Sequence, residues 1–91
     1  MLKITTRIEA TGTVFELEGK LAGPWVQELE KCWRKMPESD RSVRVLLCAV
    51  SFIDDKGREL LAKMYRHGVE LVAEGCMNKA LIEEIMGREQ G

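Results

Sequence analysis

The sequence has little of the residue types that build metal centres and disulfide frameworks. It contains a single histidine, His67, and three cysteines, Cys32, Cys48 and Cys76, with no closely spaced pair among them. Zinc sites and disulfide-stabilised domains usually show such pairs, and an odd, scattered set of cysteines fits neither. We therefore expect three reduced and mostly buried thiols, and neither a bound metal nor a cofactor.

The chain also lacks long hydrophobic runs and any strong excess of one charge. Its longest uncharged run, 45–53, is far too short to cross a bilayer and lies mid-chain, and the amino terminus has no apolar stretch of the kind that directs secretion. Lysine and arginine number 14 against 15 aspartate and glutamate, with no basic tail. These absences predict a cytoplasmic protein that neither inserts into membranes nor binds nucleic acid.

What is present indicates one small domain over residues 1–91. Apolar residues make up 45% of the chain and charged residues 32%, which is ordinary for a globular protein. Apolar and polar residues alternate over 2–9 and again over 14–21, on either side of Thr11-Gly12. Two alternating runs around a short glycine-containing loop predict an antiparallel hairpin with one buried face.

A helix is predicted after Gly23-Pro24, because the fixed φ of proline suits the first helical turn. Apolar residues, among them Trp25 and Trp33, recur at helical spacing as far as Pro37, and charged residues fill the opposite face. The two tryptophans could form a binding surface, but a single apolar stripe at this spacing is more often core. We expect both to be largely buried against the sheet.

The stretch Val43–Val50 is apolar nearly throughout, which is typical of a central strand covered by helices on both faces. The remaining elements are predicted as a loop over 51–55, a helix from about Lys56 to His67-Gly68, a strand over 69–73 and a helix from Met77 to Gly87. The order β-β-α-β-α-β-α predicts an α/β fold with a mixed sheet of about four strands. Val43–Val50 should lie inside this sheet and the first strand near an edge.

The loop after this strand, Ser51–Arg58, is the most unusual segment of the sequence, and functional groups collect at the carboxyl ends of parallel strands in open α/β sheets. Asp54 and Asp55 stand side by side at a predicted helix N-terminus, where either could cap the helix. Catalysis by paired acids would need a base, nucleophile or metal within reach, and His67 lies at the far end of the following helix. A phosphate site would need a glycine-rich loop without repelling carboxylates. Capping is therefore favoured, and we expect no enzyme.

The segment VSFIDDKGRELLAKMYRHGVELVAEG resembles the signature of STAS domains, the domains of sulphate transporters and anti-sigma factor antagonists. FELEGKLAG resembles the second strand of that family and its turn into the first helix. Asp54 and Gly57 match the family's loop, but Lys56 stands where the family has the Ser or Thr that a partner kinase phosphorylates, and Asp55 precedes it in place of Ser. The resemblance thus implies a STAS-like fold without a phosphorylated residue in this loop. The family usually adds another strand and helix, so it also implies a shortened variant or a missing tail.

The resemblance implies a non-catalytic protein-interaction module of the anti-sigma factor antagonist kind. Its regulatory loop would be Asp54, Asp55, Lys56 and Gly57, and the polar face of the following helix, with Arg58, Lys63, Arg66 and His67, would contact the partner. That partner would be an anti-sigma factor, which is a kinase-like protein, or a component of a membrane transport system. A STAS-like module that binds a small molecule or nucleotide is the alternative, and a homodimer is left open.

Overall fold

The computed structural model describes residues 1–36, 42–73 and 78–90. The elements are β1 (Leu2–Glu9), β2 (Gly12–Leu21), α1 (Pro24–Arg34), β3 (Ser42–Ile53), α2 (Asp55–Arg66), β4 (Glu70–Val72) and α3 (Lys79–Gln90). This is the predicted order, and the α/β fold class is confirmed. Among the described residues, no helix is long and apolar enough to cross a membrane.

Two predicted boundaries are wrong. Strand β3 continues to Ile53, so the predicted loop shrinks to Asp54 alone between β3 and α2. Helix α3 does not end at Gly87 but continues to Gln90. The space that a Cβ of Gly87 would occupy is open. A glycine lowers helix stability by about 1 kcal/mol but does not by itself stop the helix. Pro37 and Met77, the predicted end of α1 and start of α3, lie outside the described residues.

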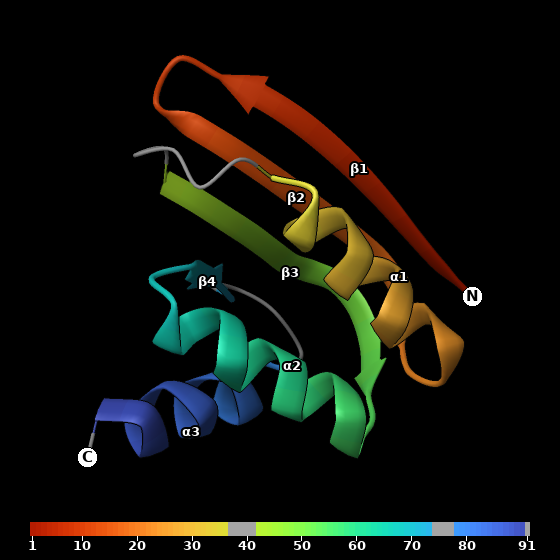
Figure 1. The fold of residues 1–91 in the computed structure, drawn as a ribbon. Coiled ribbons are helices and arrows are strands. Elements are labelled where there is room, and N and C mark those ends of the chain that lie inside the picture. Colours follow the sequence, from red (N-terminus) through yellow and green to blue (C-terminus); the bar gives the residue numbers. More distant parts are fainter. Residues whose placement is uncertain (37–41, 74–77, 91) are drawn as a thin grey trace.

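The sheet is mixed and four-stranded, with the strands in the order β1-β2-β3-β4. β1 and β2 form the predicted antiparallel hairpin, while β2 pairs with β3 and β3 with β4 in parallel. β3 is therefore interior and β1 lies at an edge, as predicted. Figure 1 shows β1 and β4 on opposite sides of the sheet, with the two longer inner strands between them.

The prediction that helices cover β3 on both faces is wrong. In Figure 1, α1 and α2 lie over the same face of the sheet, and α3 packs beside α2. On β3 the side chains of Val45, Leu47, Val50 and Ile53 are buried, whereas Arg44, Cys48, Ala49, Ser51 and Phe52 are exposed. The register between β2 and β3 shifts twice, at Glu16/Glu18 and Gly19/Lys20. Each bulge adds a residue to β3, so the buried residues of this strand do not follow a strict period of two.

The core forms one cluster between the helices and this face of the sheet. Its fully buried members come from the two inner strands and all three helices, and include Leu17, Leu29, Leu47, Leu61 and Ile82. Trp25 and Trp33 pack against the cluster but are only partly buried. The expectation of largely buried tryptophans is therefore met only in part.

A candidate partner-binding loop at the start of helix α2

Asp54 is the cap of α2. It has an extended backbone at the carboxyl end of β3, and its Oδ1 accepts a hydrogen bond of 2.7 Å from the Gly57 backbone N–H. A carboxylate in this position satisfies one of the free N–H groups of the first helical turn and interacts favourably with the helix dipole. Of the two aspartates that could have been the cap, the structure selects Asp54.

The same carboxylate also bonds to the chain just before α1. Its Oδ2 accepts a hydrogen bond of 2.9 Å from the backbone N–H of Gly23, and the Asp54 N–H donates to the Leu21 carbonyl at 3.1 Å. The N–H groups of Gly23 and Gly57 hold the pKa of the Asp54 carboxyl below its ordinary value of 3.8. Asp54 is therefore a structural anion that ties together the ends of β2 and β3 and the starts of two helices.

Gly57 lies where the first turn of α2 touches the end of β2. A Cβ built on it would be 2.7 Å from the Leu21 carbonyl oxygen and 3.1 Å from a methyl carbon of Ile53. The carbonyl is held by the N–H of Asp54, so it cannot easily move away. Glycine is needed here for close approach of two backbone segments, since its own φ is not in the left-handed region.

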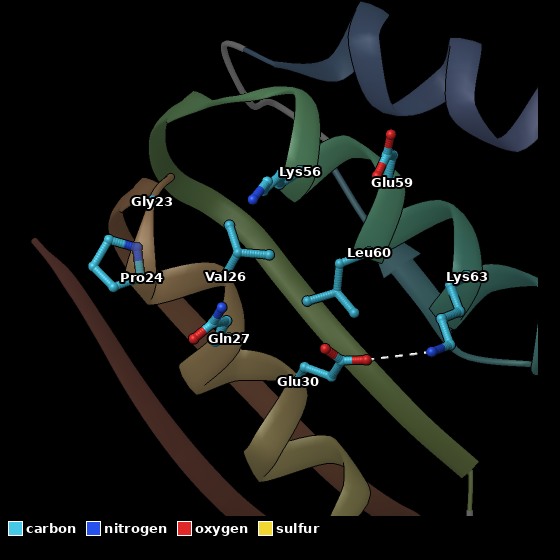
Figure 2. A pocket seen from close by; sticks show the side chains of 9 residues that line it. All are labelled: Gly23, Pro24, Val26, Gln27, Glu30, Lys56, Glu59, Leu60 and Lys63. Atoms are coloured by element: carbon cyan, nitrogen blue, oxygen red, sulfur yellow. Dashed lines mark hydrogen bonds and ion pairs between the residues drawn. The ribbon is translucent and has the colours of Figure 1, made fainter.

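The predicted loop Asp54–Gly57 is the cap and first turn of α2, and its exposed residues are Asp55 and Lys56, between the fixed positions 54 and 57. Lys56 borders a groove of about 530 Å³ between α1 and α2, and Figure 2 shows its amino group directed toward the gap beside the start of α1. The groove is lined by Gly23, Pro24, Val26, Gln27, Glu30, Lys56, Glu59, Leu60 and Lys63. The loop thus presents one carboxylate and one ammonium group on a rigid base.

An ion-pair cluster closes the other end of this groove. Lys63 of α2 contacts Glu30 of α1 at 3.2 Å, and Arg34 bonds to the same Glu30 oxygen through Nη2 at 3.0 Å and Nε at 3.3 Å. These bonds, chiefly those from Arg34 and then that from Lys63, lower the pKa of the Glu30 carboxyl below 4.5. Lys63 therefore links the two helices and is only partly available to a partner.

His67 also contacts α1. Its ring lies edge-on to Trp33, with the centroids 5.4 Å apart and the planes at 78°, and its Nδ1 is 2.8 Å from the carbonyl oxygen of Lys63. A carbonyl can only accept, so Nδ1 carries a proton in this arrangement. His67 thus helps to join the end of α2 to α1.

Arg58 and Arg66 lie on the other flank of α2. They line a second groove, of about 230 Å³, together with Glu84, Ile85 and Arg88 of α3. Arg88 pairs with Glu84 at 2.9 Å, and the Nε of Arg58 is buried without a hydrogen-bond partner among the described residues. The four predicted helix residues therefore form two surfaces: Lys63 and His67 face α1, whereas Arg58 and Arg66 face α3.

Sequence reasoning missed the contribution of α1 to the site. Gly23 contacts the loop residue Asp54, and Glu30 contacts the helix residue Lys63. The members of these pairs are 31 and 33 residues apart in the sequence. The only available signal was that the parallel strands β2 and β3 end at the same edge of the sheet, which brings the residues after each strand together. That rule places Gly23 near Asp54 but gives no hydrogen bond.

The loop offers two carboxylates and one ammonium group. Within the described ranges, no three His, Cys, Asp or Glu side chains come together as a metal site would require. No known protein family model matches the chain, and no curated protein matches it either.

Proposed function

We propose that the chain is a non-catalytic protein-interaction module of the STAS kind, which binds a protein partner through the Asp54–Gly57 loop. The observation that supports this best is the Asp54 carboxylate, which accepts hydrogen bonds from both Gly23 and Gly57. These bonds fix the backbone on each side of the exposed Asp55 and Lys56. A loop that is already ordered loses less conformational entropy when it binds a partner.

The partner we propose is a kinase-like anti-sigma factor or, as the second option, a component of a membrane transport system. The partner would recognise the Asp55 carboxylate and the Lys56 ammonium group without any prior modification, because neither side chain has a hydroxyl that a kinase could phosphorylate. Binding would then be constitutive and not switched by phosphorylation. The proposal rests on the resemblance of 50–75 to the STAS signature and on the position of these residues in the loop.

Two substitutions at one position test the proposal. Lys56→Glu and Lys56→Ser should each weaken capture of the partner from native extract, and the affinity of the purified pair should fall at least about tenfold for the charge reversal. Lys35→Glu, an equal charge change at an exposed position after the far end of α1, should leave binding unchanged. Unchanged affinity of both Lys56 variants, with melting temperatures equal to the parent, would make Lys56 an ordinary surface residue and refute the assignment.

A small-molecule or nucleotide-binding module is the second candidate. The α1–α2 groove favours it, because about 530 Å³ is within the size range of ligand sites and the groove carries both charged and apolar groups. A ligand that binds the folded chain raises its melting temperature according to concentration and affinity. A nucleotide that stabilises the parent, but not a variant with Gln27→Trp filling the groove, would support this candidate over the first.

A further inference from the structure

The outer edge of β1 is a long strand edge without a partner in the described part of the chain. β1 is the first strand of the sheet, and Figure 1 shows it on the side away from α2 and α3. It runs over Leu2–Glu9 without a proline, and its register with β2 has no bulge. Proline and bulges are two of the devices by which proteins keep edge strands from pairing, so this edge is open to another strand.

The backbone groups at this edge can be assigned from one hydrogen bond. The Met1 carbonyl accepts from the Lys20 N–H at 3.0 Å, one position beyond the pair Leu2–Gly19. In an antiparallel ladder, residues alternate between those bonded to the neighbour and those directed away from it. Odd-numbered residues of β1 therefore bond to β2, and Leu2, Ile4, Thr6 and Ile8 direct their N–H and C=O groups outward.

The same four residues are the apolar-rich face of the strand. Leu2 is buried in the core and Ile4 is partly buried, but Ile8 is 74% exposed, one of three large hydrophobic side chains exposed in the described ranges. A strand placed against this edge would cover Ile8 and satisfy the outward backbone groups at once.

The sequence of β1 complements itself in one antiparallel register. With Thr6 on a twofold axis, Lys3 lies opposite the partner's Glu9, and Ile4 lies opposite the partner's Ile8. A register centred on Thr5 places Lys3 opposite the partner's Arg7, and one centred on Arg7 sets two arginines face to face. Like charges directly opposite each other are destabilising, so the charges on β1 permit the first register and oppose its neighbours.

We infer that two copies of this chain associate through β1, antiparallel and with Thr6 on the twofold axis, so that their sheets become one. Ile4, Thr6 and Ile8 provide about six hydrogen bonds across the axis, counting both copies. The Lys3–Glu9 pair occurs twice, because a twofold interface repeats every contact. The inference does not depend on the partner-binding loop, since β1 lies at the edge of the sheet that is remote from α2.

Sedimentation equilibrium of the full chain over a concentration series tests the inference by charge reversal. The parent should dimerise, Glu9→Lys should raise the dissociation constant about tenfold or more, and Lys3→Glu combined with Glu9→Lys should restore it. Glu83→Lys, an equal charge change at an exposed position of α3, should have no effect. Ile8→Lys should also prevent dimerisation, whereas Phe52→Lys, at a residue 50% exposed on β3, should not.

Circular dichroism shows whether each variant is folded, so loss of the dimer is scored only for folded protein. A parent that stays monomeric at every concentration overturns the inference. A dimer whose dissociation constant is unchanged by Glu9→Lys also overturns it. So does failure of the double charge reversal to restore dimerisation. If Phe52→Lys abolished the dimer and Ile8→Lys did not, the interface would instead lie on the face of the sheet that carries the exposed Phe52.

Discussion

Replacing Gly57 by alanine should destabilise the protein, although the same change in most helices is stabilising. Alanine gains about 1 kcal/mol over glycine in a helix interior. Here the new Cβ would be 2.7 Å from the Leu21 carbonyl oxygen and must push it away from the Asp54 N–H. Overpacking of this kind costs about 1–3 kcal/mol, and a weakened backbone hydrogen bond adds about 0.5–1.5 kcal/mol. The net result should be a loss of about 1–3 kcal/mol in the free energy of unfolding.

The chain offers a matched control for this experiment. Gly87 lies inside α3, with no atom within 4 Å of where its Cβ would be, so Gly87→Ala should stabilise the protein by about 0.5–1 kcal/mol. Urea unfolding followed by circular dichroism measures both variants against the parent. If Gly57→Ala matched the parent or gained stability like Gly87→Ala, the close contact between α2 and the end of β2 would not constrain this position, and the reasoning would be refuted.

Three further outcomes are expected. Asp54→Asn should be less stable than the parent at pH 7 and should lose less stability on acidification. Because folding lowers the pKa of Asp54, the stabilisation from its carboxylate is complete above about pH 4 and is lost as the pH falls through the folded pKa. Urea unfolding midpoints of both proteins at pH 7 and pH 3 would measure this difference. Trp33→Ala should cost about 2 kcal/mol in chemical denaturation, less than the 3–5 kcal/mol of a fully buried tryptophan, because the ring is only partly buried; a loss above 4 kcal/mol would contradict this. After incubation with ATP and an anti-sigma kinase, mass spectrometry should find no phosphate on residues 54–57, because none of these side chains has a hydroxyl group. The hydroxyl nearest to them in the sequence is that of Ser51, whose Oγ lies 3.3 Å from the Gly19 carbonyl oxygen. Phosphate on Ser51 would mean that phosphorylation can switch this protein.

Much of the fold could be predicted because local patterns determine it. The alternation over 2–9 and 14–21 gave the hairpin, and the proline at position 24 marked the start of α1. The apolar run Val43–Val50 correctly placed β3 inside the sheet but wrongly gave it two covered faces. A bulge is a property of two paired strands, so the sequence of β3 alone could not reveal that Cys48 and Ala49 point away from the core.

The candidate site was predictable only at its centre. A carboxylate cap at this helix start was predicted, since a carboxylate before a helix accepts the N–H groups of the first turn, but the sequence left Asp54 and Asp55 as alternatives and the structure shows Asp54. Its bond to Gly23 depends on how two loops meet across parallel strands. The polar face of α2 also divides between two neighbours, because Lys63 meets α1 and Arg66 borders α3. Helical spacing shows which residues share a face but not which helix lies beside it.

The sequential order of the strands has a consequence for how the chain folds. Each strand pairs with the one that precedes it, as in Leu2 with Gly19 and Arg44 with Glu70, and the first and last strands never meet. The hairpin contacts are therefore local, whereas the parallel pairings join residues 26 to 32 apart in the sequence and none joins the two ends of the chain. During synthesis the hairpin can form before β3 has emerged from the ribosome. Each later strand can then pair with a strand that is already part of the sheet. The sheet can thus grow in one direction, in the order in which the ribosome delivers its strands.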